Sequence, residues 1–137
     1  MYENIEELKN YIKDCKKCKL CTTRQNVVFG IGNEQADIMF MPTLMECFTA
    51  TYPEAMRMGI PIVTTDLEFA RGLCGDAACY YSAIDPVAAA EAIYKVATDK
   101  EYAAKLVANG KLQLKKFDNY EQRADKLVSI LEEIASK

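Results

Sequence analysis

The sequence contains no histidine. This absence excludes the commonest general base, the Ser-His and Cys-His nucleophile pairs, and zinc held by histidine. Any catalysis must therefore use carboxylates, thiols, tyrosines or backbone groups. The chain also lacks an apolar run of the roughly 18 to 20 residues that cross a bilayer, and its polar start, MYENIEELKN, lacks the pattern of a signal peptide. We therefore expect a cytoplasmic protein with no membrane partner.

Half of the residues are hydrophobic and 27% are charged, which is the balance of a globular protein. A chain of 137 residues suffices for one hydrophobic core, so we expect a single domain over residues 1–137. The net charge of −3 gives no general reason to bind nucleic acid. Five cations near the amino terminus are expected to form a solvated helix face with only non-specific, salt-sensitive contact to phosphates: Lys13, Lys16, Lys17, Lys19 and Arg24.

The first part of the chain predicts one helix and two short strands. Apolar residues follow helical spacing over 5–15, which indicates an amphipathic helix over residues 3–20. Two β-rich runs follow, at 26–29 and 36–41, and a glycine-containing segment at 30–33 separates them. A hairpin is the simplest interpretation of this pattern.

Strands and helices then alternate along the chain. Pro53 is suited to a first helical position and Gly59 to a helix end. Asp66 and Asp85 are suited to cap the next two helices. The expected elements are strands at 36–41, 60–64 and 79–82, and helices at 53–59, 66–73 and 87–97.

The last third of the sequence predicts two further helices. Asp99 is suited to cap the first, and Gly110 within it costs about 1 kcal/mol relative to alanine, which allows a break there. Asp118 and Glu121 stand in capping-box register. They precede an apolar stripe at helical spacing, which consists of Ala124, Leu127, Val128, Leu131 and Ile134.

Alternating strands and helices indicate a parallel sheet with right-handed crossovers. The expected fold class is therefore α/β, a three-layer α/β/α arrangement. It is a reduced Rossmann-like half domain with about three parallel strands and one amino-terminal, antiparallel edge strand. The expected order in the sheet is 26–29, 36–41, 60–64 and 79–82, because an uncovered apolar edge at 36–41 would favour aggregation.

The stretch CKKCKLCTTRQNVVFGIGNEQADIMFM, with the helix before it, resembles the amino terminus of the family 4 (iron-sulfur) uracil-DNA glycosylases. The resemblance implies that a Cys-x-x-Cys pair supplies two ligands of a [4Fe-4S] cluster. It also implies a Gly-Glu-Ala-Pro-Gly motif after the strand at 36–41. This chain has Pro42-Thr43-Leu44-Met45-Glu46 there, so the loop that recognises the base and positions the catalytic water is missing. We therefore expect no specific nucleic acid partner.

Three of the six cysteines have the spacing C-x2-C-x2-C, which suits an iron-sulfur cluster or zinc where a fourth ligand exists: Cys15, Cys18 and Cys21. In the glycosylases the remaining ligands lie in a later part of the chain that has no counterpart here. A fourth ligand would have to be Cys47, Cys74 or Cys79 by coincidence. We expect vestigial thiols and no cofactor, with a [4Fe-4S] cluster as the alternative.

From about residue 36 the chain resembles the carboxyl-terminal domain of retaining glycosyltransferases of the GT-B fold. The matching text is ADIMFMPTLMECFTATYPEAMRMGIPIVTTD, then GDAACYYSAIDPVAAAEAIYKV. Its most specific element is the E-x7-E signature formed by Glu46 and Glu54. The resemblance implies that Glu46 faces the donor sugar and Glu54 holds the nucleotide ribose. It also implies that amides at the helix amino terminus receive the diphosphate, near Phe48, Thr49, Ala50 and Thr51.

Two departures from that family bear on activity. Cys47-Phe48-Thr49 stands where the family has Gly-Phe-Gly, which hinders close approach of the backbone to phosphate. The family's basic donor-binding residues and its acceptor domain have no counterpart in this sequence. We therefore expect a chimera, recombined or designed, joined at the strand over 36–41, whose sugar-nucleotide site is vestigial and which has no efficient catalysis of its own.

Two alternatives stay open. One is a truncated glycosyltransferase donor-binding domain that retains weak sugar-nucleotide binding. The other is an iron-sulfur, DNA-binding remnant of a uracil-DNA glycosylase. A reduced sheet with incompletely covered faces is compatible with a homodimer, which we expect as a partner arrangement of this chain.

Overall fold

The computed structural model describes residues 4–27, 33, 35–47 and 49–136. Its contacts divide the chain into two units, Met1–Ala36 and Asp37–Lys137. The expectation of a single domain over residues 1–137 stays a prediction. Within the described ranges, no helix is both long and apolar enough to cross a membrane.

The amino-terminal unit contains the helix α1, Ile5–Lys13, and the 3-10 helix η1, Lys19–Thr22. The side chain of Asn4 accepts a hydrogen bond from the Glu7 amide at 2.9 Å and so caps α1. The helix is shorter than the expected 3–20. The guanidinium of Arg24 donates to the Lys13 carbonyl at 2.9 Å, so a distant side chain occupies the carbonyl that a further helical turn would have used.

Three parallel strands form the sheet of the second unit, in the order β1, β2, β3. Their bounds are Met39–Met41, Ile62–Thr65 and Ala78–Tyr81. This confirms the parallel α/β fold class. The expected edge strand at 26–29 has no counterpart at Asn26 and Val27, which lie outside any strand, and Val28 and Phe29 lie outside the described residues.

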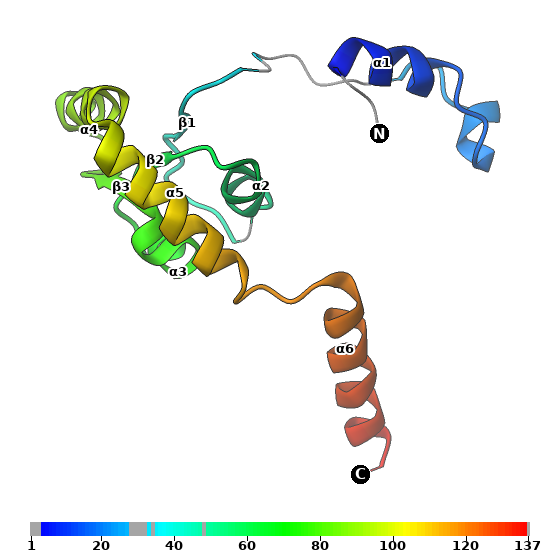
Figure 1. Ribbon diagram of the computed structural model, residues 1–137. Coiled ribbons are helices and arrows are strands. Elements are labelled where there is room, and N and C mark those ends of the chain that lie inside the picture. The colour runs from blue at the N-terminus through cyan, green and yellow to red at the C-terminus, as the bar shows by residue number, and fades with distance from the viewer. Residues whose placement is uncertain (1–3, 28–32, 34, 48, 137) are drawn as a thin grey trace. The chain divides into compact units, whose positions relative to one another are not determined.

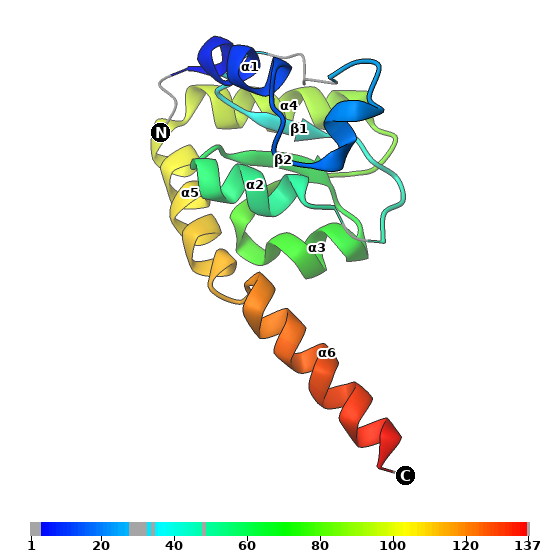
Figure 2. The same ribbon diagram turned by 90° about the vertical axis from the view of Figure 1, so that its right-hand side faces the viewer.

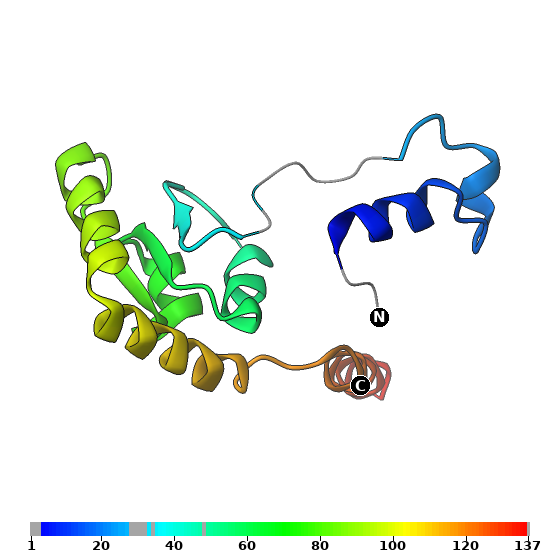
Figure 3. The ribbon, with the colours of Figure 1, turned by 45° about the horizontal axis from the view of Figure 1, so that its top comes forward.

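Helices cover both faces of the sheet (Figures 1 and 2). The helices α2, Thr51–Met58, and α3, Glu68–Cys74, lie on one face. The helix α4, Pro86–Thr98, lies on the other. The helix α5, Lys100–Leu114, packs against α2. A connection at 115–119 then leads from α5 (gold) to α6, Tyr120–Ala135 (red), as Figure 3 shows.

Each face of the sheet has its own hydrophobic core. The core under α2 and α3 consists of Tyr52, Ala55, Met56, Ile62, Ala70, Cys74, Ala77 and Ala78. The core under α4 consists of Val63, Cys79, Tyr81, Ala92, Val96 and Leu106. Successive residues of β2, such as Ile62 and Val63, enter opposite cores, as the two-residue period of a strand requires.

Several local signals gave the correct helix ends. Gly59 ends α2 with a φ of 73°, a left-handed conformation that glycine adopts without a steric cost. Asp85 accepts hydrogen bonds from the amides of Val87 and Ala88, both at 3.0 Å. Asp99 accepts one from the Tyr102 amide at 2.8 Å.

Gly110 does not break α5, which runs through it. A Cβ at this position would lie 3.1 Å from Cγ of Met56. Glycine therefore permits close approach of α5 to α2, and packing between the helices offsets its low helix propensity.

Two expected caps are wrong by one position. Asp66 does not cap α3, whose N-cap is Leu67, because both carboxylate oxygens of Asp66 accept from the guanidinium of Arg71, at 2.5 and 2.8 Å. The ion pair with Arg71 also lowers the pKa of Asp66.

The second misplaced cap concerns α6. Its capping box is Asn119 with Gln122, not Asp118 with Glu121. The carboxylate of Asp118 instead pairs with the Lys126 ammonium at 2.6 Å.

The apolar stripe of α6 is exposed. None of the residues of α6 is buried, and Figure 2 shows the helix extending away from the layers of its unit. The exposed large apolar side chains of this helix are Tyr120, Leu127, Val128, Ile130, Leu131 and Ile134. The expected homodimer stays a prediction.

Candidate functional site

The E-x7-E segment leads from the carboxyl end of β1 into α2. Glu46 and Thr49 lie in the connecting loop, and Glu54 lies in the first turn of the helix. Phe48 lies outside the described residues. In open α/β sheets, ligands bind at the carboxyl ends of the strands, so the segment stands at the edge where a ligand is expected.

Two buried threonines of β2 hold the end of β1 and the start of this loop in place. Thr65 Oγ1 donates to the Thr43 carbonyl at 2.7 Å. Thr64 Oγ1 donates to the Met41 carbonyl at 3.1 Å. Thr65 and Thr64 are 1% and 0% exposed, so water does not reach these hydroxyls in the folded protein and the two carbonyls satisfy them instead.

Tyr52 connects α2 to the same threonine pair. Its hydroxyl lies 2.7 Å from Thr64 Oγ1. Because Thr64 donates its only proton to the Met41 carbonyl, the Tyr52 hydroxyl is the donor in this contact. Burial raises the pKa of Tyr52, the hydrogen bond to Thr64 lowers it, and the nearby Glu46 carboxylate adds a smaller rise. Tyr52 therefore stays a neutral donor and fixes the first turn of α2 against the sheet.

The amino terminus of α2 has no side-chain cap of the usual kind. Ala50 occupies the N-cap position and offers no side-chain acceptor. The Thr51 amide donates to Thr49 Oγ1 at 3.3 Å, and Thr49 Oγ1 donates to Thr51 Oγ1 at 3.0 Å. A helix amino terminus with free amides carries partial positive charge and suits an anion.

The two glutamates differ in exposure. Glu54 is exposed and Glu46 is half-buried. Neither carboxylate forms a hydrogen bond or ion pair with another side chain in the described part of the chain. The structure thus places Thr49, Ala50, Thr51 and Glu54 at the start of α2, with Glu46 earlier in the preceding loop.

A hollow of about 510 Å³ lies beside the first turns of α2. It is bounded by α2, by the end of α5 and by the start of α6, and Arg57 and Arg123 line it together with Glu54. Sequence reasoning missed both arginines. Arg57 follows Glu54 at a spacing of three on the same helix face, a signal that was available, whereas nothing in the sequence places Arg123 near α2.

A second hollow, of about 630 Å³, lies at the carboxyl ends of the strands on the side of α4. Its lining is mostly apolar and includes Phe40, Leu44, Ile84 and Ile93. Phe40 stacks on Tyr81 with ring centroids 5.8 Å apart. This hollow offers apolar contact beside the loop but few polar groups for orienting a ligand.

The three amino-terminal cysteines occupy the segment around η1. Cys18 is exposed, and Cys15 and Cys21 are half-buried. Over the residues with described positions, no group of three or more histidine, cysteine, aspartate or glutamate side chains is arranged to hold a metal ion. Cys74 and Cys79, two of the conceivable fourth ligands, are buried in the second unit. Whether the chain carries a [4Fe-4S] cluster stays a matter of prediction.

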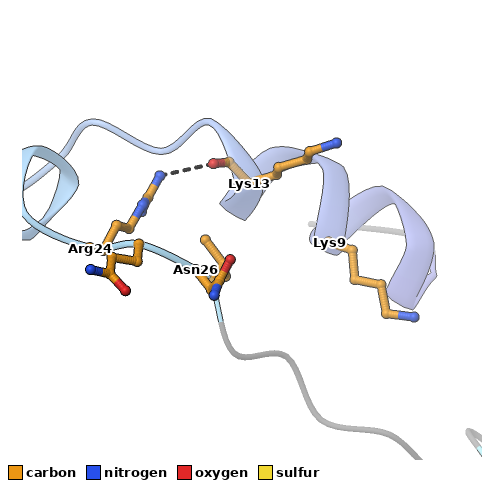
Figure 4. Close-up of a pocket in the computed structure, with 6 residues that line it drawn as sticks. Lys9, Lys13, Arg24 and Asn26 are labelled. Atoms are coloured by element: carbon orange, nitrogen blue, oxygen red, sulfur yellow. Dashed lines mark hydrogen bonds between the residues drawn. The ribbon is translucent and has the colours of Figure 1, made fainter.

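Two of the five amino-terminal cations, Lys13 and Arg24, line a hollow of about 410 Å³ together with Lys9. Figure 4 shows that Arg24 points toward the Lys13 carbonyl, while the side chains of Lys9 and Lys13 extend away from it. A specific phosphate site requires positive side chains that converge on one point. The side chains of Lys9, Lys13 and Arg24 do not converge in this way.

Replacing Thr65 by valine tests the role of the threonine pair. Valine has the same shape but no hydroxyl, so the Thr43 carbonyl loses its donor and the free energy of unfolding is expected to fall by about 1–2 kcal/mol. Urea unfolding of the purified chain measures this. Thr65→Ser keeps the hydroxyl and is the matched control. If Thr65→Val is as stable as the parent while Thr65→Ser is not, the hydrogen bond does not hold the loop.

Comparison with known proteins gives two kinds of similarity. The family model described as "Glycosyl transferases group 1" matches residues 6–99. A sucrose-phosphate synthase structure from Thermosynechococcus elongatus superposes with a TM-score of 0.65 over 74% of this chain and 26% of that one, at 21% identity. That likeness shows a shared fold.

The second similarity is local. A type-4 uracil-DNA glycosylase from Archaeoglobus fulgidus is 41% identical over 39 residues, which is 28% of this chain and 20% of the glycosylase. The chain thus spans about a quarter of the synthase and a fifth of the glycosylase.

Proposed function

Because this chain belongs to the group 1 glycosyl transferases, we propose that residues 37–136 form a donor-binding half of such an enzyme. In this proposal the unit binds a sugar nucleotide weakly through the E-x7-E segment. The chain by itself does not transfer sugar efficiently.

One observation carries the proposal: Glu54 lies exposed in the first turn of a helix that directly follows the loop at the carboxyl end of β1. A carboxylate there can accept hydrogen bonds from the ribose hydroxyls. The adjoining amides at the start of α2 suit the diphosphate. The bonds from Thr64 and Thr65 hold this arrangement before the ligand binds, which reduces the entropy lost on binding.

The same geometry supports the absence of efficient transfer. Glu54 is exposed and Glu46 only half-buried, so a bound donor would stay in contact with water. Efficient transfer requires exclusion of water and a second substrate held in line with the reacting bond.

We also propose that the two units have separate origins, with a glycosylase-like segment joined to the transferase unit. In support, the contacts divide the chain at Ala36, and the glycosylase similarity covers only 39 residues. The family match itself reaches back to residue 6, so the proposal depends on the contacts rather than on the limits of that match. In this proposal Cys15, Cys18 and Cys21 are vestigial thiols without a cluster, and the chain is a cytoplasmic homodimer.

Isothermal titration of the full chain with UDP-glucose, ADP-glucose and GDP-mannose tests the proposed function. We expect at least one to bind with a Kd of about 1 mM, and no release of nucleoside diphosphate above background in a turnover assay. Glu54→Gln is expected to weaken binding about tenfold, because the neutral amide accepts more weakly than the carboxylate.

Glu68→Gln is the matched control for this titration, since Glu68 occupies the first turn of α3 and lines neither of the two hollows of the second unit named above. It should bind as the parent does. Absence of binding by all three sugar nucleotides at about 10 mM overturns the binding function. Rapid turnover overturns the claim of inefficient transfer. The same preparation is expected to be colourless and free of iron and sulfide.

A further inference from the structure

The hollow beside α2 is lined by three charged side chains that have no partner among the described residues. In the described part of the chain, the side chains of Glu54, Arg57 and Arg123 form no hydrogen bond or ion pair. The other polar residues of the hollow are already engaged. Asp118 pairs with Lys126, and Asn119 exchanges hydrogen bonds with Gln122 in the capping box.

The charge that remains in the hollow is positive. Its lining has two guanidinium groups and one unpaired carboxylate, that of Glu54, because the second carboxylate, Asp118, is paired with Lys126. The amino termini of α2 and α6 also border the hollow, through Ala50 and Asn119, and each adds partial positive charge. A ligand with one anionic group and one group of hydroxyl donors matches this arrangement.

The two arginines reach the site from different elements. Arg57 lies in the second turn of α2, one helical turn after Glu54, and lines the same hollow as Glu54. Arg123 comes from the first turns of α6. A guanidinium offers a planar fork of donors that matches phosphate oxygens, and the volume of about 510 Å³ lies in the range of sites for small ligands.

We propose that Arg57 and Arg123 bind the diphosphate of a nucleoside diphosphate whose ribose hydroxyls donate to Glu54. This inference rests on the proposed function and adds two binding residues to it. It assigns a ligand-binding role to the α5–α6 connection and the start of α6. Phe117 and Leu114, which also line the hollow, supply apolar contact for the nucleoside.

The test is titration of the full chain with ADP, UDP and GDP, with inorganic pyrophosphate and uridine as further probes. Arg57→Gln and Arg123→Gln are each expected to weaken binding of the nucleoside diphosphates about tenfold, because each removes a charge-assisted contact. Binding of uridine, which has no phosphate, should not change. Arg57→Lys keeps the charge but not the fork and should lie between the parent and Arg57→Gln.

Lys111→Gln is the matched control, because it removes one exposed positive charge from α5 outside the hollow. Lys111→Gln should bind the nucleoside diphosphates as the parent does. All variants should have the same unfolding midpoint as the parent. If the parent binds nucleoside diphosphates and both arginine variants bind equally well, this inference fails while the proposed function stands. If Lys111→Gln weakens binding as much as they do, the effect is one of net charge and the inference also fails. If no probe binds to the parent, both fail.

Discussion

Replacing Tyr52 by alanine is expected to lower the free energy of unfolding by about 3–5 kcal/mol, the range measured for truncating a buried aromatic side chain. The Tyr52 side chain is fully buried in the core under α2 and α3, and its hydroxyl donates to Thr64. The substitution therefore leaves a cavity and removes the donor to a buried oxygen. Since a domain is stable by only about 5–15 kcal/mol, much of the stability of the second unit should be lost.

Tyr52→Phe separates the two contributions. It keeps the ring and removes only the hydroxyl, so a loss of about 1 kcal/mol is expected. Urea unfolding followed by far-ultraviolet circular dichroism measures both variants. A loss below 1 kcal/mol for Tyr52→Ala would show that this residue does not join α2 to the sheet as described.

Raising the pH from 8 to 11 is expected to destabilise the protein by about 3 kcal/mol through Cys74 alone. Burial raises the pKa of the Cys74 thiol from 9.0 to about 12. Between these two values the unfolded chain releases the thiol proton and the folded chain keeps it. The unfolded state then binds fewer protons, so the free energy of unfolding falls by about 1.4 kcal/mol per pH unit. Burial also raises the pKa of Tyr80, which adds to the loss above pH 10.

The control for the alkaline loss is Cys74→Ala. Alanine cannot ionise, so the variant should show a shallower fall of stability between pH 9 and 11, even though its stability at neutral pH is lower because of the smaller side chain. The comparison uses the slopes of the free energy of unfolding against pH. Equal slopes for parent and variant would mean that the Cys74 thiol ionises in the folded state.

Local chemistry explains what could be predicted from the sequence. Gly59, Asp85 and Asp99 act on backbone groups within a few residues of themselves, and each ends or begins a helix as expected. The alternation of apolar runs and helical patterns likewise gives the three parallel strands. These signals need no knowledge of which distant residues meet.

The wrong helix ends and caps arise where a side chain bonds to a residue outside its own helix start. The end of α1 depends on Arg24, eleven residues after Lys13. The cap of α6 moved by one position because Asp118 binds Lys126. An aspartate beside the start of a helix can either cap the helix amides or form an ion pair with a basic side chain. The sequence does not indicate which of these two interactions is the stronger.

The residues of the candidate site also differ in whether a local or a distant contact places them. The E-x7-E spacing predicts a role for Glu46 and Glu54 because both belong to one short segment, and that role stays a prediction. The threonines in IVTT give a further signal, because two hydroxyls within a strand buried on both faces must find acceptors, although the sequence does not say which ones. Arg123 could not be predicted, because its place beside α2 depends on the path of the chain from α5 into α6.

One measurement tests the central claim most directly: a two-dimensional ¹H–¹⁵N spectrum of the full chain during titration with UDP. The account predicts shifts concentrated at residues 49–57 and at Arg123, with the amides of residues 4–27 unchanged. Shifts confined to residues 4–27, or a spectrum that does not change up to about 10 mM UDP, would contradict the account.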